Sequence, residues 1–147
     1  MRILIQRVSS ATVSVDAEVV GSIGKGLLAF VGFKVGDDAE MLEYLAQKLI
    51  NLRMFEDSEG KMNLSIGELG LECLIVSQFT LYGETKKGNR PSFIEAERPE
   101  IARMLYERFV DIVRGMLGSE KVAEGRFATM MQVELVNDGP VTLLLER

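Results

Sequence analysis

Two short motifs carry the polar residues that could do chemistry in this chain. Ser77–Leu81 (SQFTL) ends an apolar run, and Asn137–Thr142 (NDGPVT) follows much later. The first motif would supply a hydroxyl, an amide and backbone N–H groups where a core strand ends, an arrangement that can orient an ester and hold an oxyanion. The chain has no histidine. Any proton transfer must therefore proceed without the commonest general base.

Thr80 is open to two interpretations. Strand periodicity over Leu74–Tyr82 would place Gln78 and Thr80 on the same face, so that both could point into one pocket. Threonine is also a good strand former, and polar residues often mark the point where a strand leaves the core. An unactivated threonine is a poor nucleophile, and no base lies near it in the sequence. The hydroxyl therefore either takes part in catalysis or has a structural role only.

The Gly139-Pro140 pair has two interpretations as well. Asn, Asp, Gly and Pro all have turn chemistry, so the pattern favours a turn between two strands. Alternatively, the glycine lets backbone approach a ligand closely while the proline locks the conformation. A cis bond would present backbone carbonyls in a fixed array, which suits rejection of a wrong substrate.

Basic side chains are concentrated at Lys86, Lys87 and Arg90, shortly after the first motif. Such a run is usually a solvated loop, and its position makes a local nucleic-acid contact the alternative. The net charge of −5 argues against broad binding to DNA or RNA, which normally requires a basic domain. Arg7 either braces the Gly-Pro turn through its carbonyls or forms a surface ion pair.

Length and composition favour a single domain over residues 1–147 with a proper hydrophobic core. Cys73 is the single cysteine, so neither an internal disulfide nor a cysteine-rich metal cluster is expected. The first apolar stretch is too short for a signal peptide, and no segment approaches the roughly 20 apolar residues of a membrane span. We expect a soluble cytoplasmic protein without a metal or cofactor.

Turn signals and hydrophobic periodicity predict an α+β fold. Alternating residues and punctuating glycines predict an antiparallel meander over Met1–Phe33, and Leu71–Leu81 is the clearest buried strand. Asp57–Gly60 has the composition of a turn. Alternate apolar residues between positions 127 and 135, followed by Val141–Leu145, predict two strands joined by the Gly-Pro turn. We expect mainly antiparallel strands in a barrel-like or two-sheet core.

Two amphipathic helices complete the prediction. The first covers Asp38–Leu52, where Asp37 and Glu40 resemble a capping box and leucines recur at positions 42, 45, 49 and 52. The second spans Pro99–Leu117, because proline suits the first turn of a helix. Its apolar face is predicted to consist of Ile101, Leu105, Phe109, Ile112 and Met116.

Six segments give the chain a specific resemblance to a known family. They are Gln6-Arg7-Val8, Gly60–Asn63 (GKMN), Ser77–Leu81, Arg90–Phe93 (RPSF), Met131-Gln132-Val133 and Asn137–Thr142. In order and spacing they resemble those of the D-aminoacyl-tRNA deacylases, the D-tyrosyl-tRNA deacylase family. The similarity runs essentially from end to end, without a departure at the signature positions.

This resemblance implies an editing hydrolase that cleaves the ester between a D-amino acid and the 3′-terminal adenosine of tRNA, and that also removes glycine from mischarged tRNA. It implies a homodimer with two active sites at the subunit interface. Gly139-Pro140 would be cis and would reach into the partner's pocket, where it excludes the side chain of an L-amino acid. The resemblance assigns the pocket to Ser77, Gln78, Phe79, Thr80 and Met131, with main-chain groups near Phe79 and Thr80 holding the adenosine and the ester.

The absence of histidine is compatible with this chemistry if the substrate brings its own catalytic group. The 2′-hydroxyl of the terminal ribose is such a group, and proximity can contribute about 7–11 kcal/mol. Substrate-assisted hydrolysis is therefore the favoured mechanism, and Thr80-dependent catalysis is the alternative. Two other functions stay open: a non-catalytic RNA-binding module, and a hydrolase of some other acyl ester.

Overall fold

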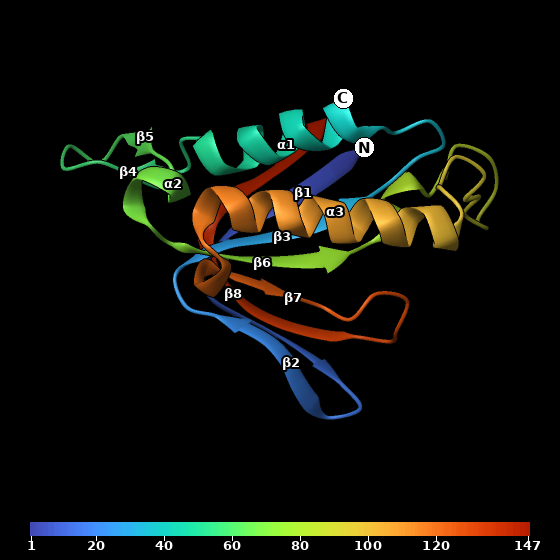
Figure 1. Cartoon of the computed structure of the whole chain (residues 1–147), viewed down its shortest axis with the longest axis horizontal. Helices are drawn as coiled ribbons and strands as arrows, with labels where there is room; N and C mark the ends of the chain where they lie inside the picture. Colours follow the sequence, from blue (N-terminus) through green and yellow to red (C-terminus); the bar gives the residue numbers. More distant parts are fainter.

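The sheet is built around one long strand, β1 (Arg2–Val15), in the computed structural model, which describes residues 1–147. The first half of β1 pairs with β3 (Gly26–Gly32) and its second half with β2 (Glu18–Ile23), both antiparallel. Along its other edge β1 pairs antiparallel with β8 (Gln132–Glu146) over nearly its whole length. The predicted antiparallel strands at the start of the chain are present, but their meander order is wrong, because β2 and β3 both pair with β1 and not with each other (Figure 1).

Two further strands extend the sheet in parallel. β6 (Glu72–Ser77) runs parallel to β3, and β7 (Val122–Glu124) runs parallel to β6. The strand order is β2-β1-β3-β6-β7, and β2 contacts β7, so the sheet curls into a nearly closed barrel. The predicted α+β class with a barrel-like core is confirmed. The parallel pairs were not predicted, and they follow from the helices in the connections, because parallel strands need a long crossover.

The first of these crossovers carries α1 (Ala39–Asn51), as predicted within one residue at each end. Its cap is a different aspartate from the predicted one. The Asp38 side chain accepts from the backbone N–H of Met41 at 2.9 Å, whereas Asp37 accepts from the backbone N–H of Lys34 at 2.9 Å. The capping box of Asp37 with Glu40 is therefore wrong, because Asp37 is used to hold the loop before the helix.

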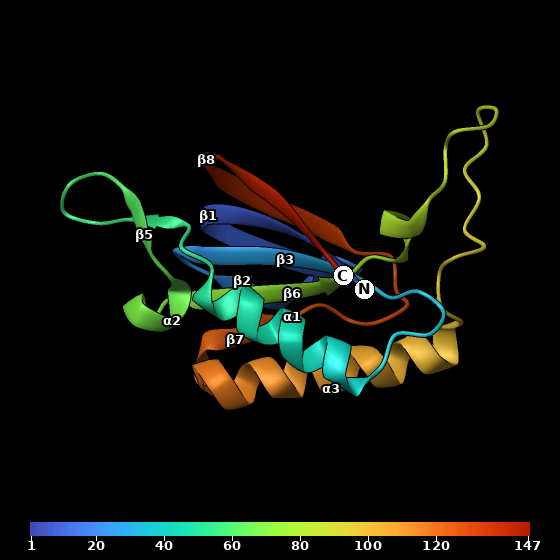
Figure 2. The same ribbon diagram turned by 90° about the horizontal axis from the view of Figure 1, so that it is seen from above.

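The second crossover carries α3 (Pro99–Leu117), and its predicted bounds are confirmed. Its predicted apolar face is confirmed in the middle, where Phe109 is buried and Leu105 and Ile112 pack half-buried against the core. It is wrong at both ends, because Ile101 and Met116 are exposed. The helix has apolar residues on both sides at helical spacing, and spacing alone does not rank them. The residues that pack against the sheet are Ala102, Tyr106, Phe109, Val110 and Val113. Figure 2 shows α1 and α3 on the same side of the sheet.

Short elements fill the remaining connections. A hairpin of β4 (Phe55–Glu56) and β5 (Met62–Leu64) precedes the short helix α2 (Ile66–Leu69). The predicted turn between its strands is confirmed: the Asp57 carboxylate accepts from the backbone N–H groups of Glu59 and Lys61, and Gly60 has φ of 76°. Two 3₁₀ helices, η1 (Phe79–Tyr82) and η2 (Ser119–Lys121), follow β6 and α3.

The apolar side chains form two cores, one on each face of the sheet. The larger core lies between the sheet and the two long helices. The smaller core lies inside the curl of the sheet, where Leu28, Leu74 and Val76 meet residues of β1 and β2. Met131 and Val133 pack against this second core from the start of β8.

No helix is long and apolar enough to cross a membrane. No group of three or more acidic or cysteine side chains is arranged to hold a metal ion.

The end of the chain is one strand and not the predicted pair. β8 continues through Gly139-Pro140, whose peptide bond is cis. Gln6 pairs with Thr142 and Val8 with Asn137, so Asp138–Val141 lie opposite Arg7 alone. The predicted turn is therefore a bulge, a position where a residue without an N–H group is tolerated in a sheet.

Candidate functional site

The first signature motif lies at the point where β6 ends. Ser77 is the last residue of β6, and the Gln78 N–H still donates to the Val31 carbonyl of β3 at 2.7 Å. The chain then turns into η1, so the predicted strand over Leu71–Leu81 is wrong in its last four residues. The turn changes the direction in which the motif's side chains point. It also leaves the N–H groups of Phe79 and Thr80 at the start of a helix, where N–H groups have no partner within the helix.

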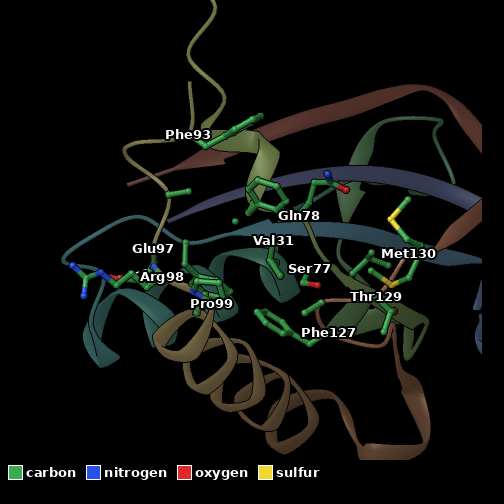
Figure 3. Close-up of a pocket in the computed structure, with 18 of the residues that line it drawn as sticks. Val31, Ser77, Gln78, Phe93, Glu97, Arg98, Pro99, Phe127, Thr129 and Met130 are labelled. Atoms are coloured by element: carbon green, nitrogen blue, oxygen red, sulfur yellow. Dashed lines mark hydrogen bonds between the residues drawn. The ribbon is translucent and has the colours of Figure 1, made fainter. Parts of the chain in front are cut away.

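A cavity of about 750 Å³ opens beside this turn (Figure 3). Its lining residues come from the ends of β3 and β6, from the start of α3 with the segment before it, and from residues 127–133 at the start of β8. Most of the lining is apolar, and Glu97 and Arg98 are its charged residues. A volume of this size suits a nucleoside carrying an amino acid.

The predicted pocket residues do not all line this cavity. Ser77, Gln78, Phe79 and Met131 do, whereas Thr80 does not. The Gln78 amide donates to the Thr80 hydroxyl, so the two side chains do lie together, although strand alternation is not the reason. No histidine, lysine or carboxylate hydrogen-bonds the Thr80 hydroxyl, and the threonine side chain is therefore without an activating base.

Aromatic rings form the walls of the cavity. Phe79 and Phe93 meet edge to face with ring centroids 5.2 Å apart. Phe127 lies below them, 5.6 Å from the Tyr106 ring and 4.8 Å from the Arg103 guanidinium carbon. Phe127 was predicted as a strand residue and was missed as a site residue. Aromatic faces of this kind are the usual platform for an unstacked base.

A buried tyrosine holds two of these walls together. The Tyr106 hydroxyl donates to the Ile75 carbonyl of β6 at 2.9 Å, and the Gly125 N–H donates to the same carbonyl at 2.9 Å. Burial raises the pKa of Tyr106, so its hydroxyl stays protonated and keeps donating. A Cβ on Gly125 would lie 2.7 Å from the sulfur of Met131. The absence of a side chain at Gly125 therefore lets Met131 occupy its place in the cavity wall.

A second glycine supports the turn itself. A Cβ on Gly32, the last residue of β3, would lie 2.8 Å from the Gln78 carbonyl oxygen and 3.2 Å from Cβ of Leu81. The backbone of η1 thus lies directly on the backbone of β3. No pattern around Gly32 in the sequence indicated this contact.

Arg7 and the Gly139-Pro140 bulge lie away from the cavity of their own chain. Arg7 is only 6% exposed, and it lies within β1 and not at a strand end. Its Nε donates to the Asp138 carbonyl at 3.0 Å and lies 3.1 Å from the Asp138 carboxylate, while Nη1 donates to the Met54 carbonyl at 2.6 Å. These contacts match the interpretation of Arg7 as a brace for the Gly-Pro segment, since a surface ion pair would be exposed.

The predicted basic residues lie on an exposed loop between η1 and α3, which Figure 2 shows extending away from the sheet. Lys86, Lys87 and Arg90 are all exposed, and Lys86 pairs with Glu84 at 3.4 Å. This loop begins and ends beside the cavity, because η1 precedes it and Phe93 follows it. It is therefore a solvated loop that also borders the candidate site.

A match to a family model that covers nearly the whole chain decides which protein family it belongs to. The model described as D-Tyr-tRNA(Tyr) deacylase matches residues 4–146. The chain belongs to this deacylase family. Proteins named D-aminoacyl-tRNA deacylase from Desulfatibacillum aliphaticivorans and Carboxydothermus hydrogenoformans are 54% and 51% identical to it over 146 residues, which is 99% of each chain.

Two solved structures extend the comparison of this deacylase-family chain. One described as c-Myc DNA Unwinding Element Binding Protein has a TM-score of 0.95 and 39% identity, and the match covers 100% of this chain and 99% of that one. One described as a probable eukaryotic D-amino acid tRNA deacylase has a TM-score of 0.86 at 21% identity, with 98% and 97% covered. At this identity the second likeness establishes the fold alone.

Proposed function

We propose that this protein hydrolyses the ester between a D-amino acid and the 3′-terminal adenosine of tRNA, and that it also releases glycine from mischarged tRNA. The observation that carries the proposal is the aromatic-walled cavity, which has the volume of an aminoacyl-nucleoside and is bordered by Ser77–Phe79. The start of η1 supplies N–H groups to the developing oxyanion, a contact that lowers the barrier to acyl transfer. Because tRNA is charged in the cytoplasm, the enzyme would act there.

The chemistry we propose is assisted by the tRNA. The charged residues that line the cavity, Glu97 and Arg98, belong to the segment before α3 and not to the Ser77–Phe79 turn. The 2′-hydroxyl of the terminal ribose lies next to the ester in every aminoacyl-tRNA, so it is available to assist the attack of water. The protein then has to position the ester and stabilise the oxyanion, which are the two tasks its backbone groups can perform.

Matched substrates test this function. We expect rapid release of tyrosine from D-tyrosyl-tRNA, little release from L-tyrosyl-tRNA, and strongly reduced release from D-tyrosyl-tRNA that lacks the terminal 2′-hydroxyl. We expect Thr80→Ala to keep most of the activity. Turnover of the deoxy substrate together with an inactive Thr80→Ala variant would instead make the Thr80 hydroxyl the catalytic group. Binding of tRNA without any turnover would make the protein a non-catalytic RNA-binding module.

A homodimer would bring the Gly-Pro bulge to this cavity. β8 pairs with β1 alone, so its outer edge is free, and Val136, Leu143 and Leu144 expose apolar surface along it. An exposed strand edge with apolar side chains is a common surface for pairing with a second chain. In such a dimer Gly139-Pro140 of one protomer would enter the partner's cavity and leave no room for the side chain of an L-amino acid.

The size of the protein in solution tests the dimer. Leu144→Glu should convert it to a monomer, because a charge would be buried on the β8 surface, and should abolish its discrimination between D- and L-tyrosyl-tRNA. Met104→Glu is the matched control, since Met104 is an exposed apolar residue on α3. A monomeric parent protein in sedimentation, or a Leu144→Glu monomer that still hydrolyses only the D substrate, would contradict a shared active site.

The basic loop would add modestly to tRNA affinity. Neutralising Lys86, Lys87 and Arg90 removes at most three phosphate contacts, so the slope of log affinity against log salt should fall by at most about 2. If both the affinity and its salt dependence stay unchanged, these residues only solvate the loop.

A further inference from the structure

A second cleft, of about 400 Å³, lies at the other end of η1. The main cavity is lined by Phe79 and Phe93, and this cleft by Tyr82 and Glu95, so the same two segments form walls of both. A 3₁₀ helix rises about 2.0 Å per residue, which separates Phe79 from Tyr82 by about 6 Å along the helix. The two sites therefore adjoin across η1.

The charges of this cleft balance. Arg2 and Lys86 face Glu84 and Glu95, so the charged lining residues sum to zero. Lys86 is already paired with Glu84, and Arg2 with Glu146 at 3.0 Å. Glu95 makes no ion pair, and its carboxylate has no hydrogen-bond partner. This set disfavours a phosphate, which would meet free carboxylate oxygens, and favours a neutral ligand that both donates and accepts hydrogen bonds.

Two buried polar atoms of the cleft residues lack partners. The Tyr82 hydroxyl and the Arg2 Nε have no hydrogen bond, although Tyr82 is only 3% exposed. The Arg2 guanidinium carbon lies 4.6 Å from the centre of the Tyr82 ring and covers it. Buried polar groups are rarely left unpaired, so these two atoms are available to a bound ligand once the Arg2 side chain moves. Burial raises the pKa of Tyr82, which keeps its hydroxyl available as a donor.

We propose that this cleft binds the base of the nucleotide that precedes the terminal adenosine of tRNA, which is a cytidine in every tRNA. The inference rests on the function proposed above. The amino group of cytosine would donate to the Glu95 carboxylate, the pairing by which acidic side chains read this base. With a shift of the Arg2 side chain, the Tyr82 hydroxyl and the Arg2 Nε would donate to the ring nitrogen and carbonyl oxygen of cytosine.

Dinucleotides that carry no ester test the subsite by binding alone. CpA should bind the full-length protein at least tenfold more tightly than UpA in calorimetric titrations, because uracil presents an oxygen where cytosine presents an amino group. Glu95→Gln should remove or reverse this preference, since its amide can donate to the uracil oxygen. Glu43→Gln, an exposed carboxylate on α1, is the matched control and should keep it. Equal affinity of the parent protein for CpA and UpA would overturn the subsite.

Tyr82→Phe gives a second test with two readouts of opposite sign. Removing a hydroxyl that has no partner should leave the unliganded protein at least as stable in urea, and should weaken CpA binding several-fold. A variant that is destabilised, or that binds CpA as tightly as the parent, contradicts the role given to this hydroxyl.

The proposed function is judged separately, by turnover of D-tyrosyl-tRNA. Absence of turnover with a retained CpA preference would refute deacylation and leave the cytidine site in place.

Discussion

A methyl group on Gly32 should impair the candidate active site although no residue of the signature motifs is replaced. In Gly32→Ala the new Cβ would lie 2.8 Å from the Gln78 carbonyl oxygen, whereas ordinary contact begins at 3.4 Å. The carbonyl must therefore move by about 0.6 Å, the difference between these two distances. This carbonyl accepts the Leu81 N–H that forms the turn of η1. The displacement is thus passed directly to Phe79 and Thr80.

Two magnitudes follow from this displacement. Overpacking of a tight contact costs about 1–3 kcal/mol of unfolding free energy. A displacement of about 1 Å at a catalytic group lowers turnover about a hundredfold, so 0.6 Å should lower kcat/KM between about tenfold and a hundredfold. Equilibrium unfolding in urea measures the first quantity, and initial rates of D-tyrosyl-tRNA hydrolysis measure the second.

Gly115→Ala is the matched control. A Cβ on Gly115 would meet nothing within 4 Å, and the residue lies in α3, where alanine is the better helix former. This variant should gain about 0.5–1 kcal/mol of stability and keep its turnover. If Gly32→Ala loses stability but keeps the kcat/KM of the parent protein, the strain is relieved away from η1, and the argument that β3 positions the turn is refuted.

Three further predictions concern stability and access. Arg7→Met should lower the unfolding free energy by about 2–3 kcal/mol in urea melts, because it leaves two carbonyl groups without their charged donor. Gln6→Ala is the control: it removes an exposed hydrogen bond and should change the unfolding free energy by about 0.5 kcal/mol or less. Hydrogen bonds lower the pKa of four carboxyl groups in the folded chain. The unfolded chain therefore binds more protons in acid than the folded chain does. The unfolding free energy should fall as the pH drops below the ordinary pKa values of these groups, 3.8 to 4.5. These groups are Asp57, Glu68, Glu84 and Glu146. Burial raises the pKa of Cys73 to about 12, so a thiol reagent should react with it only at the rate at which the protein opens.

Each of these three predictions would be contradicted by a specific result. Equal stability losses for Arg7→Met and Gln6→Ala would mean that the buried arginine contributes no more than a surface contact. Unfolding free energy that is constant from neutral pH to about pH 3 would contradict the lowered carboxyl pKa values. Asn63→Ala removes the largest contact of Asp57 and should flatten this acid dependence. Labelling of Cys73 at the rate of a free thiol would show that β6 is not sealed in the native protein.

The sequence predicted the helix boundaries well, because the residues that set them are neighbours in the chain. Pro99 begins α3 as predicted, and α1 begins within one residue of its predicted start, although its cap is Asp38 and not Asp37. The end of β6 was predicted four residues too late, because Gln78–Leu81 has good strand formers and only the contact with Gly32 requires a turn there. The C-terminal strand pair was wrong for a similar reason. Arg7 lies opposite the Gly-Pro segment and lets a bulge replace the turn.

The candidate site was predicted only where the chain is contiguous. Ser77, Gln78 and Phe79 follow one another, and their motif identified them. Pro99 reaches the same cavity from the crossover between β6 and β7, and Phe127 from the loop between β7 and β8. No local pattern indicates which loops such a topology brings together. Only the resemblance to a family predicts a relation between Ser77–Phe79 and the Gly-Pro pair, which lies outside the cavity of its own chain.

The continuity of β8 links two tasks in one 15-residue strand. Its start provides Val133 to the cavity of its own chain, and its bulge carries Gly139-Pro140 on the exposed edge. In a two-fold dimer, each chain would therefore supply the pocket of one site and the chiral filter of the other. A chain with a defective pocket and a chain with a defective filter could then complement each other: a mixed dimer would contain one site with two intact halves and one with two damaged halves. One selective site would thus be restored from an inactive chain and an unselective chain, as a direct consequence of the path of a single strand.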